Sequence, residues 1–100
     1  MPPLVKTSRG CKMIYMLCRN RVADYQTWRR IFDSHKEAHF EAGLTLVNLW
    51  QGLEDPNNVF FLFKVGNLEK AKAFVTAPGN PEIAKAAGVL DGEIHFIDGA

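Results

Sequence analysis

Two histidines, His35 and His39, stand four residues apart in the stretch 24–42. In a helix this spacing places both imidazoles on one face, a single turn apart. Such a pair can supply two ligands to a metal ion, or a general base and hydrogen-bonding group that titrates near neutrality. It can equally be a pair of core histidines bonded to a backbone carbonyl, to Tyr15 or to Tyr25. The residue types leave all three interpretations open.

A metal site would need a third ligand from elsewhere in the chain. The one remaining histidine, His95, lies close to the C-terminus, and no cysteine or acidic residue is clearly placed to complete a set. We therefore expect neither a metal ion nor another cofactor. His35 and His39 are the candidate catalytic residues, with proton transfer as their role.

One amphipathic helix is predicted over residues 24–42 to carry both histidines. At about 100° per residue, Trp28 and Phe32 fall on the same stripe as the two imidazoles. Asp24 is the expected N-cap, and Gly43 is the expected stop signal after the last turn. The face that must pack on apolar partners therefore contains both imidazoles.

Aromatic residues could complete a pocket around this face. Trp28 on the helix and Trp50 on a predicted strand could form two walls of a cavity for a flat ligand. Asn48 lies among apolar residues on the expected Leu46/Trp50 face, where it is either a polar group of the pocket or an interface hydrogen bond. The candidate ligand-binding residues are Trp28, Phe32, Tyr15, Asn48, Trp50 and His95.

Four segments rich in β-branched and aromatic residues are predicted strands. They cover residues 12–19, 44–53, 59–65 and 93–98, with turns at 20–21, 54–58 and 91–92. Residues 68–77 form a second predicted helix with Asn67 as its cap. A short helix follows to Ala87, with Asn80 as cap and Pro81 in its first turn, and Gly88 ends it.

The order β-α-β-β-α-β predicts an α+β, ferredoxin-like sandwich, with both main helices on one face of a four-stranded antiparallel sheet. Its first and third strands are apolar on both faces, whereas an antiparallel sheet with one wet face alternates apolar and polar residues. The uncovered face would expose a larger apolar patch than a monomer tolerates. We therefore expect a homodimer that packs sheet against sheet.

Composition narrows the remaining classes of partner. The chain has 100 residues, 47% hydrophobic and 23% charged, with a formal net charge of +1. This predicts one domain over 11–98, preceded by a loose arm over 1–10. Without a basic stripe or an apolar run of about 18 residues, we expect neither nucleic acid nor a membrane as partner. Cys11 and Cys18 point to opposite sides of one strand, so unpaired thiols in a reducing cytoplasm are expected.

Several short motifs carry a family resemblance that spans residues 12–98. They are W-R-R-I-F-D-S-H in the long helix, E-A-G before the second strand, D-P-N-N in the hairpin, N-L-E-K-A-K-A-F in the second helix and A-G-V near the last strand. With the element order, these motifs resemble the dimeric α/β-barrel superfamily, and most of all small uncharacterised bacterial members near the antibiotic-biosynthesis-monooxygenase-like group. The resemblance implies a homodimer with a pocket in each subunit between the sheet and the long helix.

The superfamily includes cofactor-independent oxygenases, haem-degrading enzymes, isomerases and proteins with no known reaction. Its haem-degrading members use a strand asparagine, a tryptophan and a histidine on the second helix. This chain lacks the asparagine in the apolar part of its first strand and the histidine in its second helix. The expected function is binding of a small hydrophobic molecule in the helix–sheet pocket. The alternative is a monooxygenase- or isomerase-like enzyme that uses His35 and His39.

Overall fold

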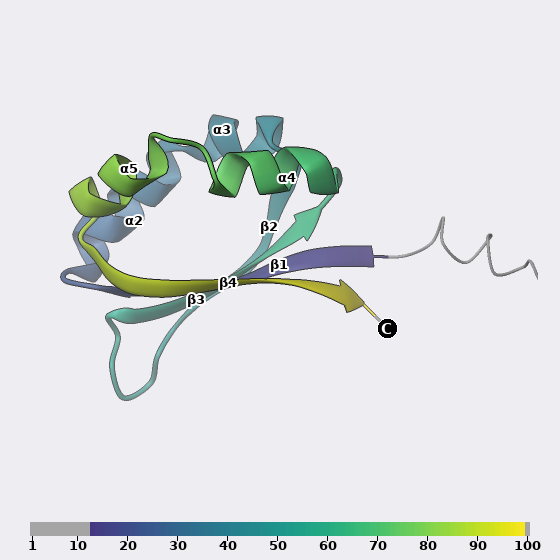
Figure 1. The fold of residues 1–100 in the computed structure, drawn as a ribbon. Coiled ribbons are helices and arrows are strands. Elements are labelled where there is room, and N and C mark those ends of the chain that lie inside the picture. The colour runs from purple at the N-terminus through teal and green to yellow at the C-terminus, as the bar shows by residue number, and fades with distance from the viewer. Residues whose placement is uncertain (1–12, 100) are drawn as a thin grey trace, which may run out of the picture.

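A computed structural model describes residues 13–99, which form a four-stranded antiparallel sheet with helices on one face (Figure 1). The elements are β1 (Met13–Val22), α2 (Tyr25–Ser34), α3 (Lys36–Glu41), β2 (Leu44–Gln51), β3 (Asn58–Val65), α4 (Leu68–Val75), α5 (Asn80–Ala86) and β4 (Val89–Gly99). The strand order is β2-β3-β1-β4. This confirms the ferredoxin-like α+β fold. The predicted N-terminal arm and Cys11 lie outside the described residues.

The two faces of the sheet have different surroundings. On the central strands, alternate residues such as Met16, Cys18 and Phe63 are buried beneath the helices. The residues between them, such as Leu17 and Leu62, point to the other face, which no described element covers (Figure 1). We call this second surface the open face. No helix within residues 13–99 is long and apolar enough to cross a membrane.

A β-bulge in β2 changes which residues face the helices. Leu46 pairs with Phe63 and Asn48 pairs with Leu62, so Val47 is an extra residue in the strand. Paired residues of antiparallel strands point to the same face of a sheet. Leu46 therefore lies on the helix side and Asn48 on the open face. The expectation that Leu46 and Trp50 share a face is wrong, because the bulge lies between them.

Two predicted turns are instead parts of longer strands. Asn20 and Arg21 of β1 pair with Gly92 and Asp91 of β4. A Cβ atom at Gly92 would lie 2.5 Å from the Asn20 side-chain amide and 2.8 Å from the Arg19 carbonyl oxygen. The glycine at this position therefore permits close approach of two strands, and does not mark a turn.

The predicted helix over residues 24–42 is interrupted at His35. The Ile31 carbonyl accepts hydrogen bonds from Ser34 Oγ at 2.6 Å and from His35 Nδ1 at 2.9 Å. The His35 backbone N–H bonds instead to the Phe32 carbonyl, three residues back, at 3.1 Å. Side-chain donors have thus replaced the regular helical donor to Ile31. The helical path resumes where the His39 N–H bonds to the His35 carbonyl at 3.0 Å.

Two of the three helix N-caps predicted from the sequence are present in the structure. Asp24 and Asn67 cap α2 and α4 through their side-chain oxygens, as predicted. Asn80 does not cap α5, because that helix has Gly79 at its N-cap and no side-chain cap bond. The Asn80 side chain instead donates through Nδ2 to the Phe74 carbonyl at 2.6 Å. This bond joins the end of α4 to the start of α5.

Candidate functional site

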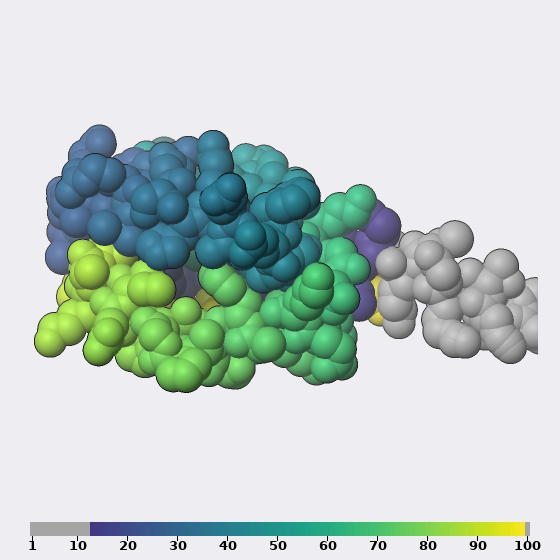
Figure 2. All heavy atoms as spheres, turned by 90° about the horizontal axis from the view of Figure 1, so that it is seen from above, coloured from purple at the N-terminus to yellow at the C-terminus, as the bar shows by residue number. Residues whose placement is uncertain are grey.

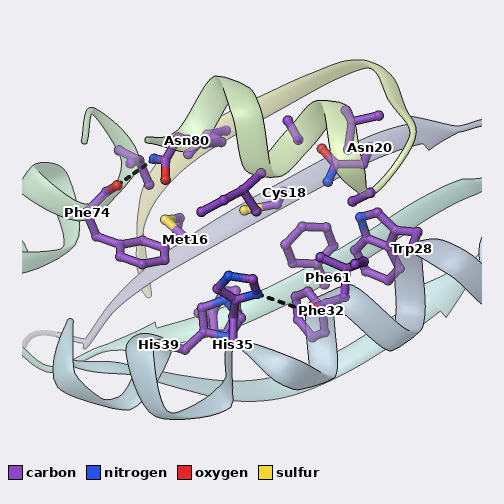
Figure 3. Close-up of a pocket in the computed structure, with 18 residues that line it drawn as sticks. Met16, Cys18, Asn20, Trp28, Phe32, His35, His39, Phe61, Phe74 and Asn80 are labelled. Carbon is purple, nitrogen blue, oxygen red and sulfur yellow. Dashed lines mark hydrogen bonds between the residues drawn. The ribbon is translucent and has the colours of Figure 1, made fainter. Parts of the chain in front are cut away.

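A cavity of about 250 Å³ lies between the sheet and the helices. Helices α2 and α3 form one side and α4 and α5 the other, while β1, β3 and β4 form the floor (Figure 3). Seen from the helix side, the molecule is hollowed between these two pairs of helices, and atoms of the sheet are visible at the bottom (Figure 2). The cavity is therefore accessible from the surface.

Four residues of the predicted helical stripe line this cavity together. They are Trp28, Phe32, His35 and His39. The rings of Trp28 and Phe32 stack with centroids 4.7 Å apart, and Phe32 meets Phe61 of the floor edge-on at 5.2 Å. The interruption at His35 does not remove either imidazole from the stripe. The spacing of these residues in the sequence thus correctly indicated that they share one surface.

The other four sequence-predicted residues do not line the cavity. They are Tyr15, Asn48, Trp50 and His95. Tyr15 pairs with the exposed Lys64, and Trp50 pairs with Phe60, both on the open face. The sheet therefore separates these residues from the two cavity histidines, and Trp28 and Trp50 cannot be two walls of one pocket within a subunit.

His35 presents a defined hydrogen-bonding pattern. Its Nδ1 lies 2.9 Å from the Ile31 carbonyl oxygen and 3.2 Å from Ser34 Oγ. A carbonyl oxygen only accepts hydrogen bonds, so Nδ1 carries the proton. In the neutral ring, Nε2 then has a free lone pair. This nitrogen lies on the side of the ring that faces Met16 across the cavity (Figure 3), and no residue within 13–99 bonds to it.

His39 has an aromatic environment. Its ring lies 5.0 Å from Phe32, 5.1 Å from Phe63 and 5.6 Å from Phe74, measured between centroids. Burial among these rings lowers the pKa of His39 below its ordinary value, and the charge of a protonated His35 lowers this pKa further. His39 is therefore neutral at pH 7 and can accept a proton without first losing one.

This shift predicts a pH dependence of stability. Because the folded pKa of His39 is below its unfolded value, the unfolded chain binds more protons as pH falls below about 6.5. We therefore expect the free energy of unfolding to decrease more between pH 7.5 and pH 5 in wild type than in His39→Gln. Urea unfolding at each pH measures this difference. Parallel curves for the two proteins would contradict a desolvated His39.

The buried thiol in the cavity floor is chemically unreactive. Burial raises the pKa of Cys18 to about 12, so its nucleophilic thiolate form is absent near neutral pH. Within residues 13–99, no three histidine, cysteine or acidic side chains gather closely enough to hold a metal ion. Among the side chains that line the cavity, the two imidazoles are therefore the groups available for proton transfer.

Two asparagines at the cavity were not predicted as site residues. With its amide oriented to satisfy both neighbours, Asn20 accepts from Trp28 Nε1 at 3.2 Å and donates to the Arg19 carbonyl at 3.0 Å. Asn80 holds the Phe74 carbonyl across the α4–α5 junction. Asn20 was assigned to a turn, although its position two residues after Cys18 places it on the same strand face. Extending the alternation of inward and outward side chains along β1 as far as Asn20 would have predicted its place at the cavity.

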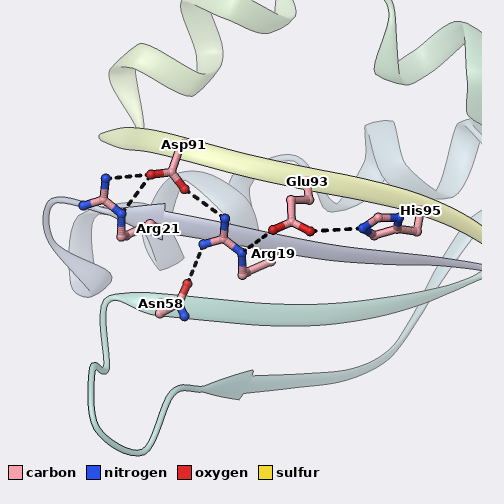
Figure 4. A network of polar contacts seen from close by, with 6 residues as sticks. All are labelled: Arg19, Arg21, Asn58, Asp91, Glu93 and His95. Atoms are coloured by element: carbon pink, nitrogen blue, oxygen red, sulfur yellow. Dashed lines mark hydrogen bonds and ion pairs between the residues drawn. The ribbon is translucent and has the colours of Figure 1, made fainter.

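A charged network occupies one end of the open face (Figure 4). Arg19 bonds to Glu93 and Asp91, each at 3.0 Å, and to Asn58 at 2.8 Å. His95 Nε2 lies 3.1 Å from Glu93 Oε1, which contributes most to lowering the pKa of that carboxyl group. His95 therefore belongs to this network and lies on the far side of the sheet from the cavity.

Comparison with known proteins identifies the fold. No family model matches the chain, and no curated protein matches it in sequence. A Bordetella bronchiseptica structure named as an antibiotic biosynthesis monooxygenase superimposes with a TM-score of 0.69 at 14% identity, over 88% of this chain and 97% of the other. A conserved protein from Methanosarcina mazei Go1 gives a TM-score of 0.67 at 16% identity, over 91% and 96%.

An Agrobacterium tumefaciens protein of the nipsnap family, of unknown function, gives a TM-score of 0.64 at 13% identity, over 88% of each chain. These similarities cover nearly the whole length of every protein compared. At such low identity they establish architecture alone. The chain thus has the ferredoxin-like fold of structures named as antibiotic biosynthesis monooxygenases and NIPSNAP proteins, which supports the resemblance seen in its sequence motifs.

Proposed function

We propose that this protein binds a small, flat, largely apolar molecule in the cavity between the sheet and the helices. The observation that carries this proposal is an accessible space of about 250 Å³ with aromatic side chains on its walls. The Trp28 and Phe32 rings stack on the helix side, and Phe61 and Phe63 lie on the floor. Flat surfaces of this kind favour a planar ligand by stacking and by burial of apolar area.

Binding can be tested with 2-methoxynaphthalene as a probe, followed by NMR titration of labelled protein. We expect chemical-shift changes at the Trp28 indole and at amides around the cavity. The Ala84→Phe substitution places a ring in the cavity and should weaken binding at least tenfold. Ala73→Phe on α4 adds the same ring at an exposed site outside the cavity lining, and should leave binding unchanged.

Equal binding by both variants would place the probe elsewhere on the molecule. No shift in the wild-type protein at saturating probe would contradict the proposed function itself. A general loss of folding in Ala84→Phe would be visible in its amide spectrum, and Ile83→Trp then provides a second obstruction from the same helix. Ile83 lines the cavity and is partly exposed at its edge.

A second candidate function is proton transfer on the bound molecule, as in a cofactor-independent oxygenase or isomerase. It is favoured by the unbonded Nε2 of His35 and by the lowered pKa of the neighbouring His39. Two imidazoles on one wall are suited to remove a proton from a carbon acid.

Exchange of hydrogen for deuterium in 2-tetralone, a flat enolisable ketone, tests this chemistry without requiring the natural substrate. We expect the wild-type protein to accelerate exchange in D₂O beside the carbonyl group. The double variant His35→Gln, His39→Gln should lose most of this acceleration. Exchange at the buffer rate with wild-type protein would favour a binding protein without catalysis.

We also propose that two copies associate through their open faces. Leu62, Trp50 and Ile97 present apolar groups on this surface, and Trp50 and Ile97 are more than two-fifths exposed. The charged residues around Arg19 are paired with one another within the subunit. A reducing cytoplasm is the proposed compartment, because the buried Cys18 thiol is unpaired.

A further inference from the structure

The carbonyl of Ile31 is the feature that determines how His35 can meet a ligand. This oxygen accepts two side-chain donors, Ser34 Oγ at 2.6 Å and His35 Nδ1 at 2.9 Å. The donors are the last residue of α2, Ser34, and the residue between the two helices, His35. The bonds therefore connect the local break in the helix directly to the orientation of one imidazole.

The same contact selects one tautomer of the neutral ring. A neutral imidazole has one N–H group and one lone pair, and either nitrogen can carry the proton. If Nε2 carried it, the Nδ1 lone pair of His35 would face the lone pairs of the Ile31 oxygen at 2.9 Å. That arrangement replaces a hydrogen bond with a repulsion. The proton is therefore held on Nδ1, and the lone pair on Nε2 is directed into the cavity (Figure 3).

The polarity of the cavity lining also affects which ligands can bind. Among the described residues that line it, none is a lysine, arginine, aspartate or glutamate. Burial also favours the neutral form of His39. An anionic ligand would lose its hydration on entry without meeting a positive partner, which is unfavourable in an apolar site. The lining therefore favours uncharged molecules.

His39 does not provide an equivalent acceptor. Its ring packs against three phenylalanines, and no residue within 13–99 bonds to either ring nitrogen. Its tautomer is therefore not set by the protein, and each nitrogen can donate or accept. Of the two imidazoles, His35 alone has its acceptor nitrogen defined before a ligand arrives.

We propose that His35 Nε2 is the fixed acceptor for a neutral hydroxyl or N–H group of the ligand, with Ile31 as the positioning residue. The cavity then selects neutral hydrogen-bond donors over anions and over apolar analogues without a donor. This inference rests on the proposed binding function and specifies the chemical class of its ligand.

Three naphthalenes of similar shape test the selection by calorimetric titration at pH 7.5. They are 2-naphthol, which is a neutral donor, 2-methoxynaphthalene, which lacks the donor, and 2-naphthoate, which is an anion. A net hydrogen bond of about 1 kcal/mol corresponds to roughly fivefold in affinity. We therefore expect 2-naphthol to bind about fivefold more tightly than 2-methoxynaphthalene, and 2-naphthoate to bind most weakly.

Matched variants assign the effect to one ring. His35→Phe should abolish the preference for 2-naphthol while 2-methoxynaphthalene still binds. The same substitution at the neighbouring imidazole, His39→Phe, should change both affinities together and keep their ratio. If the ratio is lost in His39→Phe and kept in His35→Phe, the assignment of the acceptor is wrong.

The tautomer can be measured independently of any ligand. Nitrogen-15 chemical shifts of the His35 ring above pH 7.5 should show a protonated Nδ1 and an unprotonated Nε2. Ser34→Ala should keep this tautomer, because the Ile31 carbonyl still accepts from Nδ1 when the competing hydroxyl is removed. A wild-type ring protonated on Nε2 would overturn the inference even if His35→Phe failed to fold.

The ligand experiment separates this inference from the function on which it rests. Equal affinity for 2-naphthol and 2-methoxynaphthalene, or tighter binding of 2-naphthoate, would overturn the donor selection and leave apolar binding intact. Failure of all three compounds to bind would contradict both proposals. Each result therefore identifies which of the two proposals is wrong.

Discussion

The Leu62→Lys variant is expected to be monomeric, whereas the wild-type protein should have about twice the mass of one 11.2 kDa chain. Leu62 lies in the middle of β3 on the open face, between its partners Leu17 and Asn48 on the two neighbouring strands. Packing of two open faces would bury this side chain, and an ammonium group there would lose its hydration without a partner. Light scattering at micromolar concentration measures the mass.

Phe40→Lys provides the matched control, because it adds the same charge at an exposed apolar residue of α3, away from the sheet. We expect this variant to remain dimeric. The change at Leu62 should raise the dimer dissociation constant by at least 30-fold, which corresponds to about 2 kcal/mol, as for a central interface residue. A monomeric wild-type protein, or a dimeric Leu62→Lys variant, would contradict association through the open face.

Replacing Trp28 with alanine should have the largest effect on stability. The Trp28 side chain is 2% exposed, stacks on Phe32, meets Phe61 at 5.4 Å and bonds to Asn20. Removing so large a buried side chain typically costs about 3–5 kcal/mol, which is a large part of the stability of a small domain. Urea unfolding at one fixed protein concentration measures the loss.

Trp28→Phe separates packing from hydrogen bonding at the same position. It keeps an aromatic ring against Phe32 but removes the indole N–H that Asn20 accepts. We expect a loss clearly smaller than that of Trp28→Ala. If both variants lost the same free energy, the hydrogen bond rather than the ring packing would be the main contribution. A loss below about 1 kcal/mol in Trp28→Ala would show that the ring is not part of the core.

Local patterns of apolar residues were sufficient to predict the fold and one wall of the cavity. The helical stripe brought Trp28, Phe32, His35 and His39 together, because a period of 3.6 residues persists through the interruption of the helix. The caps at Asp24 and Asn67 were also correct, since a side-chain oxygen at that position satisfies nearby N–H groups whatever the tertiary context.

The errors arise where tertiary contacts decide between local alternatives. Asn20 and Gly92 are residue types common in turns, yet they pair with each other because β1 and β4 continue past them. Asparagine is a common helix cap, but the Asn80 side chain donates to the Phe74 carbonyl instead. Asn20 and Asn80 thus contact partners that are not their neighbours in sequence, so the residues immediately around each asparagine do not predict these contacts.

Two faces of one strand cannot be distinguished when both are apolar. Tyr15 was the predicted cavity residue of β1, but the packing of the helices on this strand places its neighbour Met16 inside. Trp50 and His95 were also predicted to lie at the cavity, but they lie on the open face. The division of roles between the two faces is therefore a property of the assembled sheet.

The bulge at Val47 has a consequence for how this strand tolerates change. Upstream of it, even-numbered residues such as Leu44 and Leu46 face the helices, while downstream Leu49 does so in their place. A point substitution at Val47 leaves this arrangement in place. Deletion of the same residue would remove the bulge and make Asn48 the direct neighbour of Leu46, so Leu49 would still point to the helices and Trp50 to the open face. Val47 is therefore a surplus position of β2, and the strand can lose this one residue without exchanging its two faces.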